Sequence, residues 1–261
     1  MSVSTATPIG AEPFRIGSAL SRTVKIFLDN ILLFVGLAFL YAAPSLLLRF
    51  ALGLEPTQIQ GPKPDGPAFD IHLLWLAFLL IPFHILVTST LVVTTIQKIQ
   101  GEAIDVWAAL RRALDRFLPI LGIWLMIYLF SAVGFLLLIV PGFIVGLMFC
   151  VAMQASLAEG LGPWASMQRS RQLTEGEKWR IFGLFLATFL VLGVSSLLIG
   201  AIIAFAGGFL DIPVAFVGST ASFIESLIWT PFMAVLLGVL FHDLRAAKEG
   251  PGTSRFVHVF E

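Results

Sequence analysis

Two residues with side chains suited to chemistry inside a membrane are Glu225 and His84, which both lie deep within apolar segments. At ~1.5 Å per helical residue, each lies near the middle of a bilayer if its segment crosses one. An ionisable residue at that depth usually faces a partner or water. Hydroxyl side chains flank both residues at helical spacing: Ser219, Ser222, Ser226 and Thr230 beside Glu225, and Thr88 and Thr95 beside His84. We therefore take His84, Glu225, Ser222 and Ser226 as a candidate intramembrane polar site.

This polar site has two interpretations, and the sequence leaves both open. In the first, the two faces line a cavity in which Glu225 and His84 bind a cation, a proton or a polar headgroup. In the second, Glu225 is neutral or hydrogen-bonded to neighbouring hydroxyl groups and serves helix packing. A proton-coupled carrier normally shows several ionisable groups at the membrane midplane. The segments 118–139, 142–158 and 181–207 supply none at that depth.

Patterns typical of enzymes are missing from the sequence. It has no H-E-x-x-H, no G-x-x-x-x-G-K-[ST], no G-x-S-x-G and no tight cluster of acidic residues. The single Cys150 excludes an intramolecular disulfide and a metal site built on several thiolates. His242 and Asp243, beside Arg245, are typical of a solvated interfacial cluster. We expect a non-enzymatic protein without a cofactor.

The composition indicates which elements must position these residues. Of 261 residues, 58% are hydrophobic and 12% are charged, whereas soluble domains carry about a quarter charged residues. A segment of ~20 apolar residues is long enough to cross a bilayer. The sequence predicts an all-α, polytopic integral membrane protein with six transmembrane helices arranged as three hairpins, each preceded by a cytoplasmic amphipathic helix. The expected spans are about 30–50, 71–96, 118–139, 142–158, 181–207 and 213–241.

The basic residues predict the orientation. All but Arg49 and Lys63 of the 16 Lys and Arg residues fall on one side of the six spans, and cytoplasmic loops carry the excess of positive charge. Both termini should therefore be cytoplasmic. We expect a disordered tail over 1–13, a single transmembrane domain over 14–246 with an external loop over 53–70, and a cytoplasmic tail over 247–261. The net charge is zero and by itself says nothing about partners, and the sequence has no nucleic-acid footprint.

Three cytoplasmic segments resemble one another, which supports a threefold internal plan. Residues 19–22 match residues 109–112 at an offset of 90, and Glu102, Trp107 and Arg112 recur 57 positions later. Helical spacing gives the first two segments an apolar face that is expected to lie in the headgroup region. These faces are Ile16, Leu20, Val24 and Phe27 in the first, and Ile104, Trp107, Leu110, Leu114 and Phe117 in the second.

Short connections and small residues predict how the spans pack. We expect residues 140–142 to form a tight external turn that makes spans three and four an antiparallel hairpin. Small residues at every fourth position permit close helix packing, either within the chain or in a homodimer: Gly142 and Gly146, and Gly200, Ala204 and Gly208.

Three stretches carry a resemblance to a known family. Segments of that family are similar to three stretches of this chain. They are residues 159–184 (EGLGPWASMQRSRQLTEGEKWRIFGL), residues 231–250, which include Phe241-His242-Asp243-Leu244-Arg245, and residues 15–30. The family is the bacterial one labelled glycerophosphoryl diester phosphodiesterase membrane domain, related to the YciC-like inner-membrane proteins. The resemblance implies a location in the bacterial inner (plasma) membrane. Its label comes from members fused to a soluble phosphodiesterase domain, which is not seen after span six, so it implies no hydrolase activity here.

These observations lead to three functional hypotheses. The leading one is a basic cytoplasmic ring that binds anionic lipid headgroups or a cytoplasmic protein partner; its residues are Arg22, Arg112, Arg169 and Arg171. The alternative is a transporter or lipid-handling protein that uses a polar cavity around Glu225 and His84. A third is an enzyme at the cytoplasmic interface, which would require Glu159, Arg169, His242 and Asp243 to converge.

Overall fold

The computed structural model describes residues 15–51, 71–137, 139–210 and 214–250. These residues contain α-helices and no strand, which confirms the all-α prediction. The predicted tail over 1–13, the external loop over 53–70 and most of the tail over 247–261 lie outside this range. The helices are α1 (Ile16–Asp29), α2 (Ile31–Ala51), α3 (Ile71–Gln100), α4 (Val106–Asp115), α5 (Phe117–Leu137), α6 (Ile139–Phe149), α7 (Ala152–Glu159), α8 (Pro163–Thr174), α9 (Lys178–Phe209) and α10 (Val214–Glu249).

Among the described residues, five helical segments are long and apolar enough to cross a membrane. A sixth is obtained if α1 and α2, which meet at an angle of 81°, form one bent span. Several long apolar helices therefore indicate a membrane-embedded protein. The unbent segments are Leu80–Gln100, Phe117–Leu136, Val140–Glu159, Lys178–Phe209 and Thr220–Glu249.

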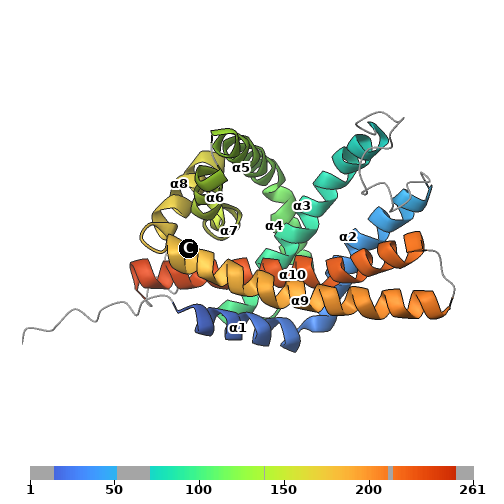
Figure 1. The fold of residues 1–261 in the computed structure, drawn as a ribbon. Coiled ribbons are helices and arrows are strands. Elements are labelled where there is room, and N and C mark those ends of the chain that lie inside the picture. The colour runs from blue at the N-terminus through green and yellow to red at the C-terminus, as the bar shows by residue number, and fades with distance from the viewer. Residues whose placement is uncertain (1–14, 52–70, 138, 211–213, 251–261) are drawn as a thin grey trace, which may run out of the picture.

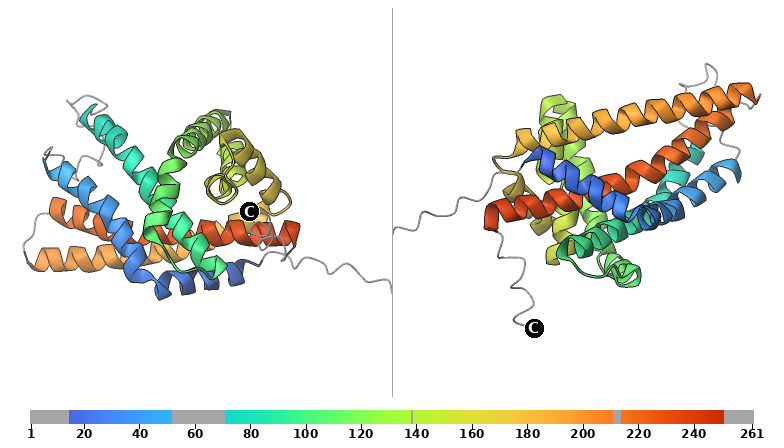
Figure 2. Two further views of the ribbon diagram at one scale, coloured as in Figure 1. Left: turned by 180° about the vertical axis from the view of Figure 1, so that it is seen from behind. Right: turned by 90° about the horizontal axis from the view of Figure 1, so that it is seen from below.

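Helix α10 lies at the centre of the molecule and packs against α1, α2, α3 and α9. It runs beside α9, and α1 lies across both of them, as the view from below shows (Figure 2). Helices α5 to α8 gather at one end of this assembly (Figure 1). The core is densest where the second half of α3, over 85–95, meets the second half of α10, over 231–244.

The three copies of the sequence repeat bury residues at the same positions. In each copy, two small residues four positions apart are completely buried, and all six occupy matching places: Ala19 and Thr23, Ala109 and Ala113, and Ser166 and Ser170. Large apolar residues of α1 and α4 point outward instead. Val24 is 38% exposed, and Trp107 is 61% exposed. Small side chains therefore supply part of the contact between these helices and the rest of the protein, and the large side chain of Phe27 in α1 is also buried, at 6% exposed.

The predicted fourth span, 142–158, is divided into α6 and α7 by turn residues at 150–151. Side chains of α8 bind the backbone groups that the break releases. The Ser170 hydroxyl donates to the carbonyl of Met148 at 2.8 Å and accepts from the backbone N–H of Val151 at 3.3 Å. Thr174 also donates to the Met148 carbonyl, at 3.3 Å. The backbone groups at the break between α6 and α7 are thus hydrogen-bonded to side chains of the same protein.

The connection between α5 and α6 differs from the prediction. Residues 140–142 form the first turn of α6 instead of a loop, because proline is tolerated in the first turn of a helix. The two helices approach closely at two glycines, since a Cβ placed on Gly134 would lie 2.9 Å from the Cα of Gly142.

Other small residues are used differently from the prediction. Gly146, Gly200 and Gly208 have no neighbouring atom of the described residues within 4 Å of a Cβ placed on them, so they mediate no close packing within the part of the chain that the structure describes. Gly207 takes that role in α9, where a Cβ would collide with the side chain of Val217 on α10. Helix α10 also continues to Glu249, three residues beyond the boundary expected at 246.

Candidate functional site

A pocket of about 280 Å³ lies where α1, the end of α3 and the second half of α10 meet. Two features distinguish it: its charged lining residues are all basic, and its floor is apolar. The lining residues are Arg22, Lys25 and Ile26 of α1, Lys98 and Ile99 of α3, and Val239 and His242 of α10.

Helix α1 is fixed over the pocket by aromatic packing and by an ion pair. The ring of Phe27 stacks on Phe34 of α2 with centroids 6.4 Å apart, and it meets Phe232 of α10 edge-on at 5.6 Å. One turn before, Arg22 forms an ion pair with Asp243 of α10. These contacts hold Arg22 and Lys25 opposite Lys98, in the last turn of α3, where a helix end favours positive charge.

The charges of the pocket are incompletely neutralised. Asp243 compensates Arg22, but the side chains of Lys25 and Lys98 have no hydrogen bond or ion pair among the described residues. The Nδ1 atom of His242 is buried without a hydrogen-bond partner, and it lies 3.7 Å from a carboxylate oxygen of Asp243. A phosphate or carboxylate group is the complement of such a lining.

A shallow apolar groove continues from the pocket along the outer face of α1. Its volume is about 590 Å³, and Lys25 borders both the groove and the pocket. Leu28 in the groove is 57% exposed. The other lining residues are Gly17, Leu20, Ser21, Val24 and Asp29.

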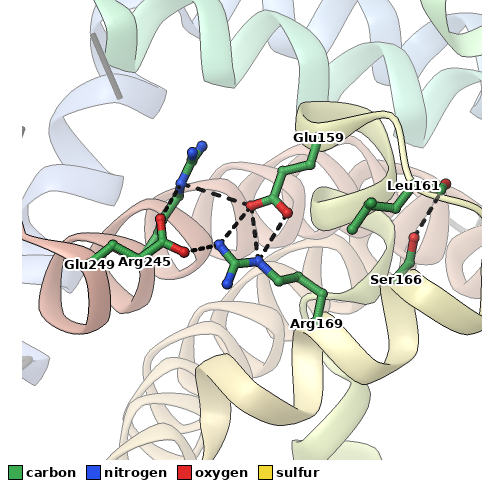
Figure 3. Close-up of polar contacts among 6 residues, drawn as sticks. All are labelled: Glu159, Leu161, Ser166, Arg169, Arg245 and Glu249. Carbon is green, nitrogen blue, oxygen red and sulfur yellow. Dashed lines mark hydrogen bonds and ion pairs between the residues drawn. The ribbon is translucent and has the colours of Figure 1, made fainter. Parts of the chain in front are cut away.

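A second charged cluster joins α7, α8 and α10 (Figure 3). The guanidinium of Arg169 donates to both carboxylate oxygens of Glu159, at 2.9 and 3.1 Å from Nε, and to Glu249. Arg245 donates from Nε to the other oxygen of Glu249 at 2.9 Å. Burial by itself lowers the pKa of Arg169, but the hydrogen bonds and charges of Glu159 and Glu249 outweigh it and raise that pKa above its ordinary value. The charges in this cluster compensate one another.

Two arginines pair with the carbonyl groups that end α7. Arg112 of α4 donates to the carbonyls of Leu157 and Ala158 at 2.7 and 3.3 Å. Arg116 donates to the carbonyl of Gly160 at 2.6 Å. The last carbonyls of a helix have no partner within it, so these arginines act as its cap.

The predicted basic ring is thus only partly available to a ligand. Arg22, Arg112 and Arg169 occupy matching places in the repeat, and each binds another helix of the same chain. Arg171 is exposed and has no side-chain partner among the described residues. Of these four residues, Arg22 alone lines the basic pocket.

The two ionisable residues of the predicted intramembrane site, His84 and Glu225, make no polar contact with each other among the described residues. Neither a hydrogen bond nor an ion pair connects His84 with Glu225 in the described part of the chain. The ring of His84 packs against Tyr41 of α2 at 4.7 Å and Trp124 of α5 at 5.7 Å, between ring centroids. The hydroxyls of the remaining two site residues donate to carbonyls of their own helix: Ser222 to Gly218 at 3.0 Å, and Ser226 to Phe223 at 2.7 Å.

The four residues that the hypothesis of an interfacial enzyme requires lie in two separate clusters. Glu159 and Arg169 belong to the ion-pair cluster, whereas His242 and Asp243 lie at the basic pocket. No polar contact joins the two pairs within the described residues.

Searches of protein-family models, curated proteins and solved structures yield no match to this chain.

Sequence reasoning missed the grouping of Lys25, Lys98 and His242. Each was visible as a basic or titratable residue at the end of a span, but they are far apart in the chain. Their grouping depends on the 81° bend between α1 and α2, which brings α1 back over α9 and α10 and places it at the pocket beside the end of α3. No local pattern signals this grouping, because Lys98 is followed by the acidic Glu102 only four positions later.

Proposed function

We propose that this is a non-enzymatic membrane protein that binds the phosphate of an anionic lipid headgroup in the pocket between α1, α3 and α10. The observation that carries the proposal is the convergence of Arg22, Lys25 and Lys98, with no acidic side chain in the lining. Basic pockets between membrane helices on the cytoplasmic side are suited to acidic headgroups. This proposed function is the leading hypothesis from the sequence, with the binding residues of the basic ring replaced by those that line this pocket.

The proposal includes the membrane arrangement expected from the sequence: six spans in three hairpins, with both termini cytoplasmic in a bacterial inner membrane. The excess of basic residues on one side supports the orientation. The outward apolar side chains of α1 and α4 support their lying in the headgroup region as amphipathic helices. In that position the basic pocket opens at the depth of lipid phosphates.

The groove on α1 favours a lipid over a soluble anion. A lipid joins a charged group to apolar chains, and here Lys25 separates a basic pocket from a surface of Leu20, Val24 and Leu28. Apolar groove residues would be costly to leave in water, whereas they are suited to acyl chains. The charged headgroup of a lipid would therefore lie in the pocket, and its apolar chains would lie in the adjacent groove.

The proposal is tested with the purified full chain in a mild detergent. Short-chain phosphatidylglycerol and phosphatidylcholine are titrated separately, and bound lipid is counted by native mass spectrometry. We expect phosphatidylglycerol to bind more tightly. Lys25→Gln and Lys98→Gln should each weaken it about fivefold, because one interfacial charge contributes about 1 kcal/mol.

The matched control is Lys178→Gln, which removes a lysine at the start of α9, outside the pocket. It should leave the affinity unchanged. Equal affinity for the two lipids, or equal weakening by all three variants, would reject the pocket as the binding site. In that case capture of a cytoplasmic protein by Arg171 and the exposed face of α8 would become the better explanation of the basic surface.

A further inference from the structure

We infer that the group bound in the basic pocket is a phosphate monoester, which carries three terminal oxygens, and not the diester found in most phospholipid headgroups. This inference rests on the proposed function and specifies its ligand. Three observations support it: the charge that remains uncompensated, the donors that remain unpaired, and the size of the pocket.

The first observation is the charge balance around the pocket. Arg22, Lys25 and Lys98 each carry a positive charge, and the adjacent Asp243 compensates one of them through its pair with Arg22. The side chains of Lys25 and Lys98 form no ion pair among the described residues, and the acidic Asp29 lines the groove beside Lys25 but not the pocket, so two positive charges in the pocket lining remain for a ligand. A phosphate diester carries one negative charge, whereas a monoester carries about −1.5 to −2 at pH 7. The monoester matches the remaining charge more closely.

The second observation is the supply of hydrogen-bond donors. The ammonium groups of Lys25 and Lys98 have no partner among the described residues, and each has three N–H bonds to donate. The side chain of Arg22 is 46% exposed, so its guanidinium remains accessible beside Asp243, whose side chain is 11% exposed. A diester offers two non-bridging oxygens to these groups, and a monoester offers three. Only the monoester supplies one terminal oxygen for each of the three cations.

The third observation is the volume of about 280 Å³. It lies just below the range of ~300–1,000 Å³ that is typical of sites for larger ligands. A phosphate with a glycerol stem is small enough for this pocket. The apolar floor of Ile26, Ile99 and Val239 suits that stem better than it suits a second charged phosphate.

The position of Asp243 adds a reason for selectivity. Its carboxylate already pairs with Arg22, so an incoming anion has to compete with it for the guanidinium. A dianion competes with a carboxylate better than a monoanion does. If Arg22 turns toward the ligand, Asp243 remains beside the unpartnered Nδ1 of His242, 3.7 Å away, as an alternative partner.

The experiment compares short-chain phosphatidic acid, phosphatidylglycerol, cardiolipin and phosphatidylcholine on the detergent-solubilised full chain, at equal concentration and at pH 7.5. Cardiolipin carries two charges on two diesters, so it separates total charge from monoester chemistry. We expect phosphatidic acid to bind about fivefold more tightly than phosphatidylglycerol, and more tightly than cardiolipin. Lys98→Gln should reduce this preference, and Lys178→Gln should preserve it.

The other outcomes separate the two proposals. Equal binding of phosphatidic acid and phosphatidylglycerol, both above phosphatidylcholine, overturns the monoester inference and leaves the proposed function in place. Binding no tighter than that of phosphatidylcholine overturns both. If free glycerol 3-phosphate displaces phosphatidic acid at comparable concentration, the monoester chemistry stands, but the lipid source in the proposed function is wrong.

Discussion

The guanidinium Nε of Arg112 lies 2.7 Å from the carbonyl oxygen of Leu157, and this contact joins α4 to the end of α7 across 45 positions of the chain. The same side chain reaches the carbonyl of Ala158. A residue first noticed for its repeated positive charge thus pairs with backbone groups that the helix leaves without partners.

The first prediction concerns this helix cap. Arg112→Ala should destabilise the protein by about 1–2 kcal/mol, because hydrogen bonds from a charged group are lost and two carbonyls lose their partner. The effect is measured as a lower thermal unfolding midpoint in mild detergent. Arg111→Ala is the matched control, since Arg111 is exposed and contacts the ring of Trp107 at 5.1 Å. An equal loss in both variants would show that the cap contributes nothing specific.

The second prediction concerns the ion-pair cluster of Figure 3. Arg169→Ala leaves the carboxylates of Glu159 and Glu249 with Arg245 as their remaining partner, so we expect a loss of about 2 kcal/mol. Arg171→Ala, on the same helix and exposed, should change the unfolding midpoint little. A double-mutant cycle between Arg169 and Glu249 should give a coupling energy above zero. Strictly additive effects would mean that this ion pair contributes no stability.

The third prediction concerns the close approach of α5 and α6. Gly134→Ala should destabilise the pair by about 1–3 kcal/mol, because the new methyl group meets the backbone of Gly142 at 2.9 Å and cannot rotate away. Gly146→Ala adds the same methyl group where no atom lies within 4 Å. It should be tolerated in a thermal unfolding measurement. Tolerance of both substitutions would contradict the close packing at Gly134.

The fourth prediction distinguishes a packing role of His84 from a proton-binding role. His84→Phe should keep the stability of the protein, because a flat ring still packs between Tyr41 and Trp124 and no unpaired nitrogen is buried. His84→Ala should cost about 2 kcal/mol through the lost ring contacts. Both are compared by thermal unfolding. A transporter that depends on the His84 proton would lose uptake in the Phe variant despite its normal stability, and that result would restore the alternative hypothesis.

The fifth prediction concerns Asp243, which holds Arg22 beside the pocket. Asp243→Asn keeps a carbonyl oxygen near Arg22 but removes a negative charge, so anionic lipid should bind about fivefold more tightly. The unfolding midpoint, measured in parallel, verifies that the variant is folded. Weaker lipid binding by a folded variant would argue against an anion site at this position.

The class of fold was predictable because it depends on local properties. Long apolar segments predict helices of the right length, and the starts of α2, α5 and α9 fall within a few residues of the expected boundaries. The repeat was equally visible, and the six matching buried small residues strengthen it. Periodicity placed Phe27 with the residues of the first segment that were expected in the headgroup region, whereas Phe27 is buried against Phe34 and Phe232.

The candidate site was not predictable in the same way, because it depends on which helices meet. The sequence indicated that Arg22, Lys25 and Lys98 share one side of the membrane, but no local pattern indicates that α1 folds across α10. The same holds for His84 and Glu225, which no polar contact joins among the described residues. Depth in the bilayer follows from counting residues, whereas the direction in which a side chain faces depends on neighbours that are remote in sequence.

The packing of α1 against α10 has a consequence for how this protein is made. Ribosomes deliver the chain from its first helix to its last, so α1, whose buried face includes Ala19, Thr23 and Phe27, is made long before α10 exists to pack against it. During that interval the buried face of α1 is open, and Arg22 lacks Asp243. The basic pocket is complete only after α10 has packed against α1 and α3, so the proposed ligand would bind only to a chain that has finished assembling.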